Sequence, residues 1–364
     1  MRLHTFLLFF TLFVLCIVFL ASTTPIAPHE AQLFYTSSSW VAQAMHLGSS
    51  YVEGFFGLRI VFVILAILAT IAFLLFALEY FRPRVKDAYM ATAIFLFLPG
   101  ILVASTLASE AMAVIMLVSL YLYAHIRGKL WLEIVVMVGF LFIHLASAIF
   151  FTALLIYALV NKQKQTILIS TIFLAFSLVF EKFIVIGGRP SGYLVELFGV
   201  YAALFSPFVF LYVVFAFYRI LIRQDKKLIW YISFIPFVAS LLLSIRQRIS
   251  LMDFAPYVMM AIIPALEIYY RSLRVRLPEH QGFHKKGFVV VLSMLFIASA
   301  SIVLSRPLFE VLSDPNKHFA YRIYGPYWKA QELKADNKSC FDSNSLKESC
   351  QMRYYGIVPC NKER

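Results

Sequence analysis

Apolar segments free of charged residues recur along the whole of this chain, and most are long enough to cross a lipid bilayer. A hydrocarbon core of about 30 Å requires a helix of about 17–25 apolar residues. The pattern therefore predicts an all-α polytopic membrane protein with about eleven transmembrane helices. The predicted spans are residues 5–21, 58–80, 88–106, 111–126, 131–145, 147–161, 166–183, 195–221, 228–245, 250–270 and 287–304.

The turns between these segments alternate between basic and non-basic. The composition is 62% hydrophobic and only 14% charged, so the turns carry much of the formal charge of +13. Basic residues gather in the loops at 82–87, 127–130, 162–165, 222–227 and 271–286. The positive-inside rule predicts that these loops are cytoplasmic and that the remaining turns lie outside. Basic residues in such loops set the orientation of the protein and contact anionic lipid headgroups. The positive net charge therefore does not indicate nucleic-acid binding.

The charge alternation predicts a multi-pass protein of a bacterial inner membrane, with a cytoplasmic amino terminus and a periplasmic carboxyl terminus. The first span is predicted to be an uncleaved signal anchor, with a cleaved signal peptide as the alternative. Residues 1–304 form the predicted transmembrane domain, in which 22–57 is an outer amphipathic loop. Residues 305–364 form a small polar periplasmic tail, in which two of Cys340, Cys350 and Cys360 are expected to form a disulfide.

The span centres are almost free of ionisable residues, whereas a proton- or ion-coupled transporter is expected to hold them near the midplane. The ionisable residues outside the cytoplasmic loops instead gather at the predicted outer ends of the spans. This distribution predicts a site at the outer membrane surface, open to a lipid-linked substrate. The residues concerned are His29, Glu30, Glu53, Glu110, His144, Arg189, Arg246 and Arg248.

Several segments together resemble the membrane glycosyltransferases of the GT-C superfamily, in particular the protein O-mannosyltransferases and the aminoarabinose transferases of lipid A. An acidic residue opens the first outer loop in PHEAQLFYTSS, an arginine begins the second span in GLRIVFVIL, and LVASTLASEAMAV and AHIRGK delimit the fourth span. The later segments GGRPSGYLVELFGVYAALFSPF and SIRQRISLMDFAPYVMMAIIPAL are also similar. The chain departs from the family pattern in four respects. It has His29-Glu30 where Asp or Asp-Glu is usual, Glu110 where aspartate is usual, and His144 where the family has lysine. It is also expected to be a short form, without the long C-terminal domain of the family.

The resemblance implies a catalytic pair of carboxylates and a set of cations for phosphate. Glu30 would deprotonate the acceptor hydroxyl or hold a divalent metal with His29, and Glu110 would orient the acceptor or share that metal. Cations would neutralise the phosphate leaving group. The implied phosphate-binding residues are Arg246, Arg248, Arg189, His144 and Arg59.

Each of these residues also has an ordinary structural interpretation. Glu30 and Glu110 would then be solvated loop or turn carboxylates, and Arg246 and Arg248 would anchor the chain to lipid phosphate. Arg189 would be a loop charge, His144 a packed polar residue, and Arg59 an anchor at a helix end.

The resemblance implies an enzyme that transfers a sugar from a polyprenyl-phosphate-linked donor to a lipid, glycan or protein acceptor at the outer face of the inner membrane. The alternative is a non-enzymatic protein, either a flippase-like carrier or a scaffold of envelope glycan assembly. A carrier requires a polar path across the bilayer, whereas an enzyme requires a carboxylate and a phosphate-binding arginine at the outer face.

Overall fold

The computed structural model describes residues 1–143, 147–180, 192–223, 225–311, 318–338, 340–342 and 345–360. Two of the predicted site residues, His144 and Arg189, lie outside the described residues.

The described part of the chain is helical, and its one β-type pairing is an isolated bridge between Cys340 and Val358. The prediction of an all-α fold is therefore confirmed. The α-helices are α1 (Leu3–Thr23), α2 (Pro28–Thr36), α3 (Trp40–Tyr51), α4 (Phe55–Tyr80), α5 (Val85–Leu96), α6 (Pro99–Thr106), α7 (Ala111–Ile126), α8 (Leu130–Ile143), α9 (Ser147–Val160), α10 (Lys164–Phe180), α11 (Leu194–Phe205), α12 (Pro207–Arg223), α13 (Leu228–Ser244), α14 (Ala255–Met259), α15 (Ile262–Val275), α16 (Pro278–Val303), α17 (Ser305–Val311), α18 (Tyr321–Ala335) and α19 (Leu346–Tyr354). A short 3₁₀ helix, η1 (Leu251–Asp253), precedes α14.

Each predicted span coincides with one helix or with consecutive helices. Within the described residues, α1, α4 and α16 are long and apolar enough by themselves to cross a membrane. The pairs α5–α6 and α11–α12 also qualify if each pair counts as one span, although they bend by 65° and 108°. The apolar helices α7, α8, α9, α10 and α13 are shorter.

Proline accounts for both bends. Pro99 begins α6 and Pro207 begins α12, and the residue that precedes a proline is disfavoured in the helical conformation. Ser206 accordingly has a ψ of 139°, in the extended range, and it combines this ψ with a positive φ of 73°. Residues 195–221, predicted as a single span, therefore form two helices that meet at Ser206.

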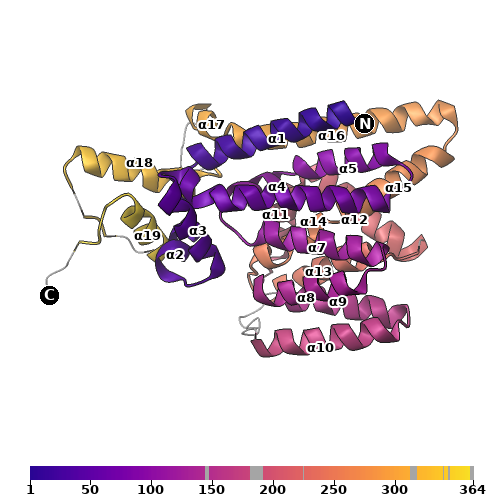
Figure 1. The fold of residues 1–364 in the computed structure, drawn as a ribbon. Coiled ribbons are helices and arrows are strands. Elements are labelled where there is room, and N and C mark those ends of the chain that lie inside the picture. Colours follow the sequence, from indigo (N-terminus) through magenta and orange to yellow (C-terminus); the bar gives the residue numbers. More distant parts are fainter. Residues whose placement is uncertain are drawn as a thin grey trace. The chain divides into compact units, whose positions relative to one another are not determined.

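The chain divides into two compact units, and each is made of segments that are separate in the sequence. The first unit comprises residues 1–11, 66–102 and 110–299. In it α7, α8, α9 and α10 lie side by side, and α13 packs on α9 (Figure 1). A stack of buried rings from Phe140, Phe150 and Tyr257 fills the space between α8, α9 and α14, with the centroids of Phe140 and Phe150 4.3 Å apart.

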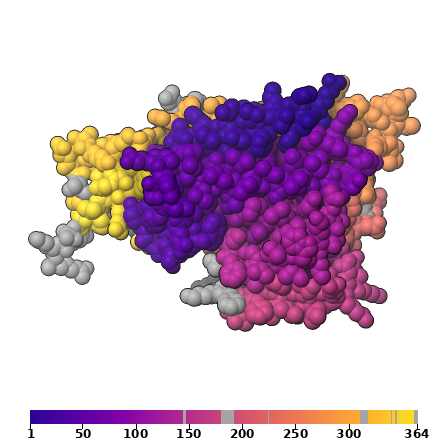
Figure 2. Space-filling view, viewed as in Figure 1, coloured from indigo at the N-terminus to yellow at the C-terminus, as the bar shows by residue number. Residues whose placement is uncertain are grey.

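The second unit comprises residues 12–65, 103–109 and 300–364. Within it the tail helix α19 packs on α2, and the yellow tail surface lies against the indigo surface of the segment 22–57 (Figure 2). The Gln351 side chain donates hydrogen bonds to the carbonyls of Ile26 (2.9 Å) and Arg322 (3.3 Å). The tail thus gains from α2 a packing surface that its own small core would not supply.

The tail also contains the expected disulfide. Cys340 is bonded to Cys360, with their Cα atoms 4.8 Å apart, while Cys350 is buried and free. The bond links residues that also approach through the backbone, because Phe341 donates a hydrogen bond to the carbonyl of Val358 (2.9 Å).

We expect mass spectrometry of the non-reduced protein to find one peptide that links Cys340 to Cys360. Cys350 should react with a thiol reagent only after unfolding, because its side chain is buried between α19 and α2. A bridge from Cys350 to either neighbour, or three free tail thiols, would contradict this pairing.

Candidate functional site

Glu30 and Arg59 are placed by two neighbouring helix starts in the second unit. Pro28 begins α2, so Glu30 is the third helical residue and its carboxylate folds back onto the N–H of Ala27 (2.9 Å). Arg59 lies in the second turn of α4. The start of α4 packs tightly beside α3, because a Cβ at Gly57 would collide with the carbonyl of Val52.

The Glu30 carboxylate accepts four hydrogen bonds. Its Oε1 accepts from Arg59 Nε (3.0 Å) and from the N–H of Ala108 (2.7 Å). Its Oε2 accepts from Arg59 Nη2 (2.6 Å) and from the N–H of Ala27. A carboxylate offers about four lone-pair positions, so the acceptor capacity of Glu30 is fully used.

The Arg59 guanidinium is likewise saturated. Besides Glu30, it donates to the carbonyls at the end of α1, with distances of 3.3 Å to Ala21, 2.6 Å to Thr24 and 2.9 Å to Pro25. All five N–H donors of an arginine thus have an acceptor. The Arg59 and Glu30 side chains are 0% and 2% exposed. This burial excludes the interpretation of Glu30 as a solvated loop carboxylate. Arg59 does serve as an anchor at a helix end, because it holds the carbonyls that follow and end α1.

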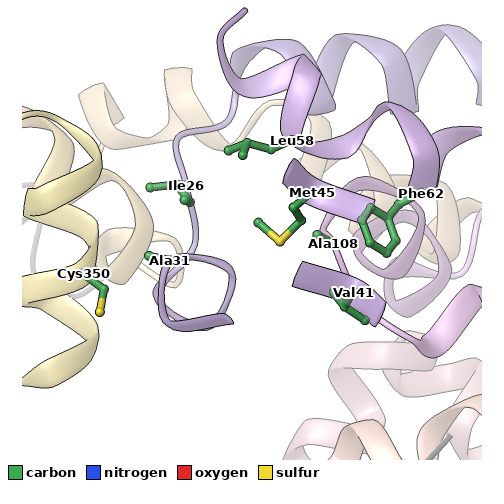
Figure 3. Packing of buried hydrophobic residues seen from close by; sticks show 8 residues of the cluster. All are labelled: Ile26, Ala31, Val41, Met45, Leu58, Phe62, Ala108 and Cys350. Atoms are coloured by element: carbon green, nitrogen blue, oxygen red, sulfur yellow. The ribbon is translucent and has the colours of Figure 1, made fainter. Parts of the chain in front are cut away.

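Apolar packing surrounds the ion pair. Figure 3 shows Ile26 and Ala31 on the side of Cys350 in α19, Val41 and Phe62 on the opposite side, and Met45 of α3 between the two groups. The aromatic residues of the outer loop point into this cluster, as Trp40 lies 6.0 Å from Phe62 and Phe34 lies 4.0 Å from His46, centroid to centroid.

A phenol beside the cluster stays neutral. Burial raises the pKa of Tyr354 in the tail, and the neighbouring Arg59 charge opposes this effect. Tyr354 therefore contributes a protonated ring to the packing near the ion pair at neutral pH.

The remaining described candidates, Glu110, Arg246 and Arg248, belong to the first unit. Glu110 is half-buried at the amino end of α7, and the two arginines are exposed just beyond α13. The last residues of α7, His125 and Ile126, line one cavity with Leu228 and Ile229, the first residues of α13. The two helices are therefore antiparallel, and Glu110 and Arg248 lie at the same end of this unit.

Arg248 has a partner that the sequence analysis missed. Its guanidinium binds the Glu196 carboxylate of α11 through Nη2 (2.6 Å) and Nε (3.3 Å), and it lies over the Tyr193 ring at 5.8 Å. The two charged side chains are 71% and 46% exposed. The signal available in the sequence was Glu196 itself, an acidic residue at the start of a predicted span on the outer side.

The position of Glu30 does not fit the metal site suggested with His29. Every oxygen lone pair of this carboxylate already faces an N–H group, and the adjacent Arg59 adds a positive charge. Over the part of the chain that the structure describes, no group of three or more His, Cys, Asp or Glu side chains has a metal-binding arrangement.

No protein-family model matches this sequence, and no curated protein matches it. Among solved structures, the chain is similar to "Crystal Structure of ArnT from Cupriavidus metallidurans in the apo state". The match covers 96% of this chain and 74% of that chain, with a TM-score of 0.56 and 14% sequence identity. At this sequence identity the match shows that the chain shares the fold of that ArnT structure.

We expect Arg59→Ala to lower the free energy of unfolding by about 3–5 kcal/mol, because it leaves the Glu30 charge buried without its partner. The matched control is Arg248→Ala, which removes an exposed ion pair and should cost less than about 1 kcal/mol. Unfolding by a denaturing detergent, followed by circular dichroism, measures both. Equal losses in the two variants would contradict the structural role given to the buried pair.

Proposed function

We propose that the chain is an integral membrane glycosyltransferase of the GT-C type. It transfers a sugar from a polyprenyl-phosphate-linked donor to a lipid, glycan or protein acceptor at the outer face of a bacterial inner membrane. The observation that carries the proposal is the likeness of fold, over nearly the whole chain, to ArnT, a lipid A aminoarabinose transferase.

The reaction requires two chemical functions from the protein. A base takes the proton of the acceptor hydroxyl as its oxygen attacks the anomeric carbon. The bond from that carbon to the phosphate oxygen breaks, and its electron pair leaves with the polyprenyl phosphate. Attack opposite the leaving group inverts the anomeric carbon, and cations that face the phosphate stabilise its growing charge.

In this proposal Glu30 and Glu110 have different roles. Glu30 is a positioning residue, because its saturated contacts with Arg59, Ala27 and Ala108 leave no lone pair for an acceptor proton. Its contact with the N–H of Ala108 holds the backbone of a residue that stands two positions before Glu110 in the chain. Glu110, half-buried at the amino end of α7, is the proposed general base.

Arg248 is the proposed ligand of the donor phosphate. Its two N–H groups now hold the carboxylate oxygens of Glu196, and this is the fork geometry that also binds two phosphate oxygens. The pair is exposed, so a phosphate can replace the carboxylate without burying an unpaired charge. Arg246 lies in the turn directly after α13, two positions before Arg248, and we assign it to the loop or to lipid headgroups.

The rival function is that of a carrier for lipid-linked sugars. The bent pairs α5–α6 and α11–α12 favour it, because discontinuous helices are common in transporters. However, the residues at the two bends, Phe97-Leu98 and Ser206, carry no charge. Transporter sites at such breaks usually bind ions or charged groups, and the transferase is therefore favoured.

The carboxylate assignment predicts different outcomes for two conservative variants. Glu110→Gln should lower kcat by about 10²–10⁴-fold, the usual contribution of general-base catalysis, without a change in melting temperature. Glu30→Gln should lower melting temperature and activity together, while the exposed control Glu53→Gln changes neither. Turnover of a polyprenyl-phosphate sugar by purified protein is the assay. A large loss of kcat in fully stable Glu30→Gln protein would reverse the two roles.

The phosphate assignment predicts a graded series at Arg248. Arg248→Ala should lower kcat by about 10²-fold, and Arg248→Lys should recover only part of this loss because lysine lacks the fork. Glu196→Gln should lower KM for the donor, since it weakens the competitor for Arg248. Unchanged rate and donor KM in an Arg246→Ala/Arg248→Ala double variant would show that these arginines are surface anchors.

A further inference from the structure

A charged cavity lies in the first unit at the opposite end of α13 from Arg248. Its volume is about 410 Å³, and the turn after α4, the start of α5 and the last turns of α15 surround it. Five of its lining side chains are cationic and two are carboxylates, which leaves an excess of three positive charges. The cations are Arg82, Arg84, Lys227, Arg271 and Arg274.

Glu267 neutralises one part of this cavity. Its carboxylate accepts hydrogen bonds from Lys227 Nζ (2.8 Å), Arg271 Nη2 (2.6 Å) and the Tyr80 hydroxyl. The Lys227 ammonium also lies 4.4 Å from the centre of the Tyr80 ring. These contacts fix Lys227 and Tyr80 as a wall of the cavity.

Two of the arginines that line the cavity do not bind the Glu267 carboxylate. Arg84 and Arg274 are exposed, and neither side chain makes a hydrogen bond or ion pair with another described residue. Asp87 lies in the same cavity and interacts electrostatically with both, but it forms no ion pair with either over the described part of the chain. The arrangement leaves two guanidinium groups directed at one space and available to an anion.

An apolar cavity of about 320 Å³ adjoins the charged one. Tyr80 and Lys227 line both cavities, so the same wall separates the two. Most of the other residues that line this second cavity are apolar or aromatic: Phe76, Leu122, Ile126, Tyr157, Leu228 and Ile229. Glu79 and His125 also line it, and each has an ionic partner, Arg127 (2.9 Å) for Glu79 and Glu133 (3.3 Å) for His125. A cationic space and an apolar space thus share a boundary, as a ligand with a charged head and a hydrocarbon chain requires.

We propose that the two cavities together bind a membrane lipid through its phosphate group. The phosphate lies between Arg84 and Arg274, because guanidinium groups bind phosphate oxygens through paired N–H groups. The hydrocarbon chain lies along Phe76 and Ile126. The loops at 82–87 and 271–286, which contribute the arginines, are those that the charge pattern predicts to face the cytoplasm, where anionic lipids are abundant. A soluble phosphate shares the head-group chemistry but would leave the apolar cavity unused.

This site is separate from the proposed donor site. Lys227 immediately precedes α13, whereas Arg248 follows its carboxyl end. A helix of 17 residues is about 25 Å long, so one phosphate cannot contact both positions.

Native mass spectrometry of the full-length protein in mild detergent tests the proposal. With equal amounts of phosphatidylglycerol and phosphatidylcholine added, we expect selective retention of phosphatidylglycerol. The Arg84→Ala/Arg274→Ala double variant should reduce retention at least tenfold, with an unchanged melting temperature because both side chains are exposed. The matched control is Arg276→Ala, which removes an arginine of the same loop that does not line the cavity. Equal retention by the double variant and wild type, or equal binding of the two lipids, would overturn the proposal.

A second arm distinguishes a lipid from a soluble phosphate. Ile126→Trp narrows the apolar cavity and should weaken phosphatidylglycerol retention while leaving the binding of inorganic phosphate, measured by calorimetry, unchanged. If Ile126→Trp has no effect on lipid retention and millimolar inorganic phosphate displaces the lipid, the pocket is a soluble-phosphate site and the lipid assignment fails.

Discussion

The buried ion pair of Glu30 and Arg59 is the interaction on which the second unit depends. Removing two charges from water costs several kcal/mol per ion, and the cost is offset only when both groups are fully hydrogen-bonded. Here that condition is met by the carbonyls that end α1, the first turn of α2, the start of α4 and the N–H of Ala108. Because these partners come from separate segments, the pair specifies how the segments meet, and a loss of any one leaves a buried charge unsatisfied.

The tail completes this arrangement. Gln351 satisfies the carbonyl of Ile26, next to Pro25, whose own carbonyl is held by Arg59. Cys350 packs on Ile26 and Ala31, so α19 covers the side of the outer loop that would otherwise expose apolar surface. The Cys340–Cys360 bond limits the freedom of the chain around α19. A short polar tail can in this way have a defined structure without a large core of its own.

The sequence predicted the helices well because their signal is local: a charge-free run of sufficient length forms a helix wherever it occurs. The bend at Ser206 was missed although its signal, proline at 207 inside an overlong span, is also local. Long-range pairing left no such signal. Glu30 and Arg59 are 29 positions apart, and Glu196 and Arg248 are 52 apart. The residues around Glu30 or Arg248 in the sequence do not indicate whether the side chain is already hydrogen-bonded to a distant residue or is available to bind a ligand. The choice of Cys360 over Cys350 as the partner of Cys340 likewise depends on tertiary packing.

In the first unit, the two ends of the antiparallel helices α7 and α13 carry different sets of charged residues. At one end Glu110, Arg246 and Arg248 offer a carboxylate and exposed cations, and at the other a cationic cavity adjoins an apolar one. The bilayer explains the separation, because charged groups are disfavoured along the intervening helices. Lipid-borne phosphates on both membrane faces would then have matching arginines, with chemistry confined to the end that has the carboxylate.

The most direct test of the central claim, that this protein cleaves a lipid-linked sugar donor, is a single-turnover assay of polyprenyl phosphate release. Purified protein in excess is mixed with a labelled polyprenyl-phosphate sugar and an acceptor lipid in nanodiscs. The proposal predicts release of free polyprenyl phosphate in equal amount to the sugar transferred, with inverted configuration at the anomeric carbon. Donor that binds and moves between leaflets with its glycosidic bond intact would contradict it and identify a carrier.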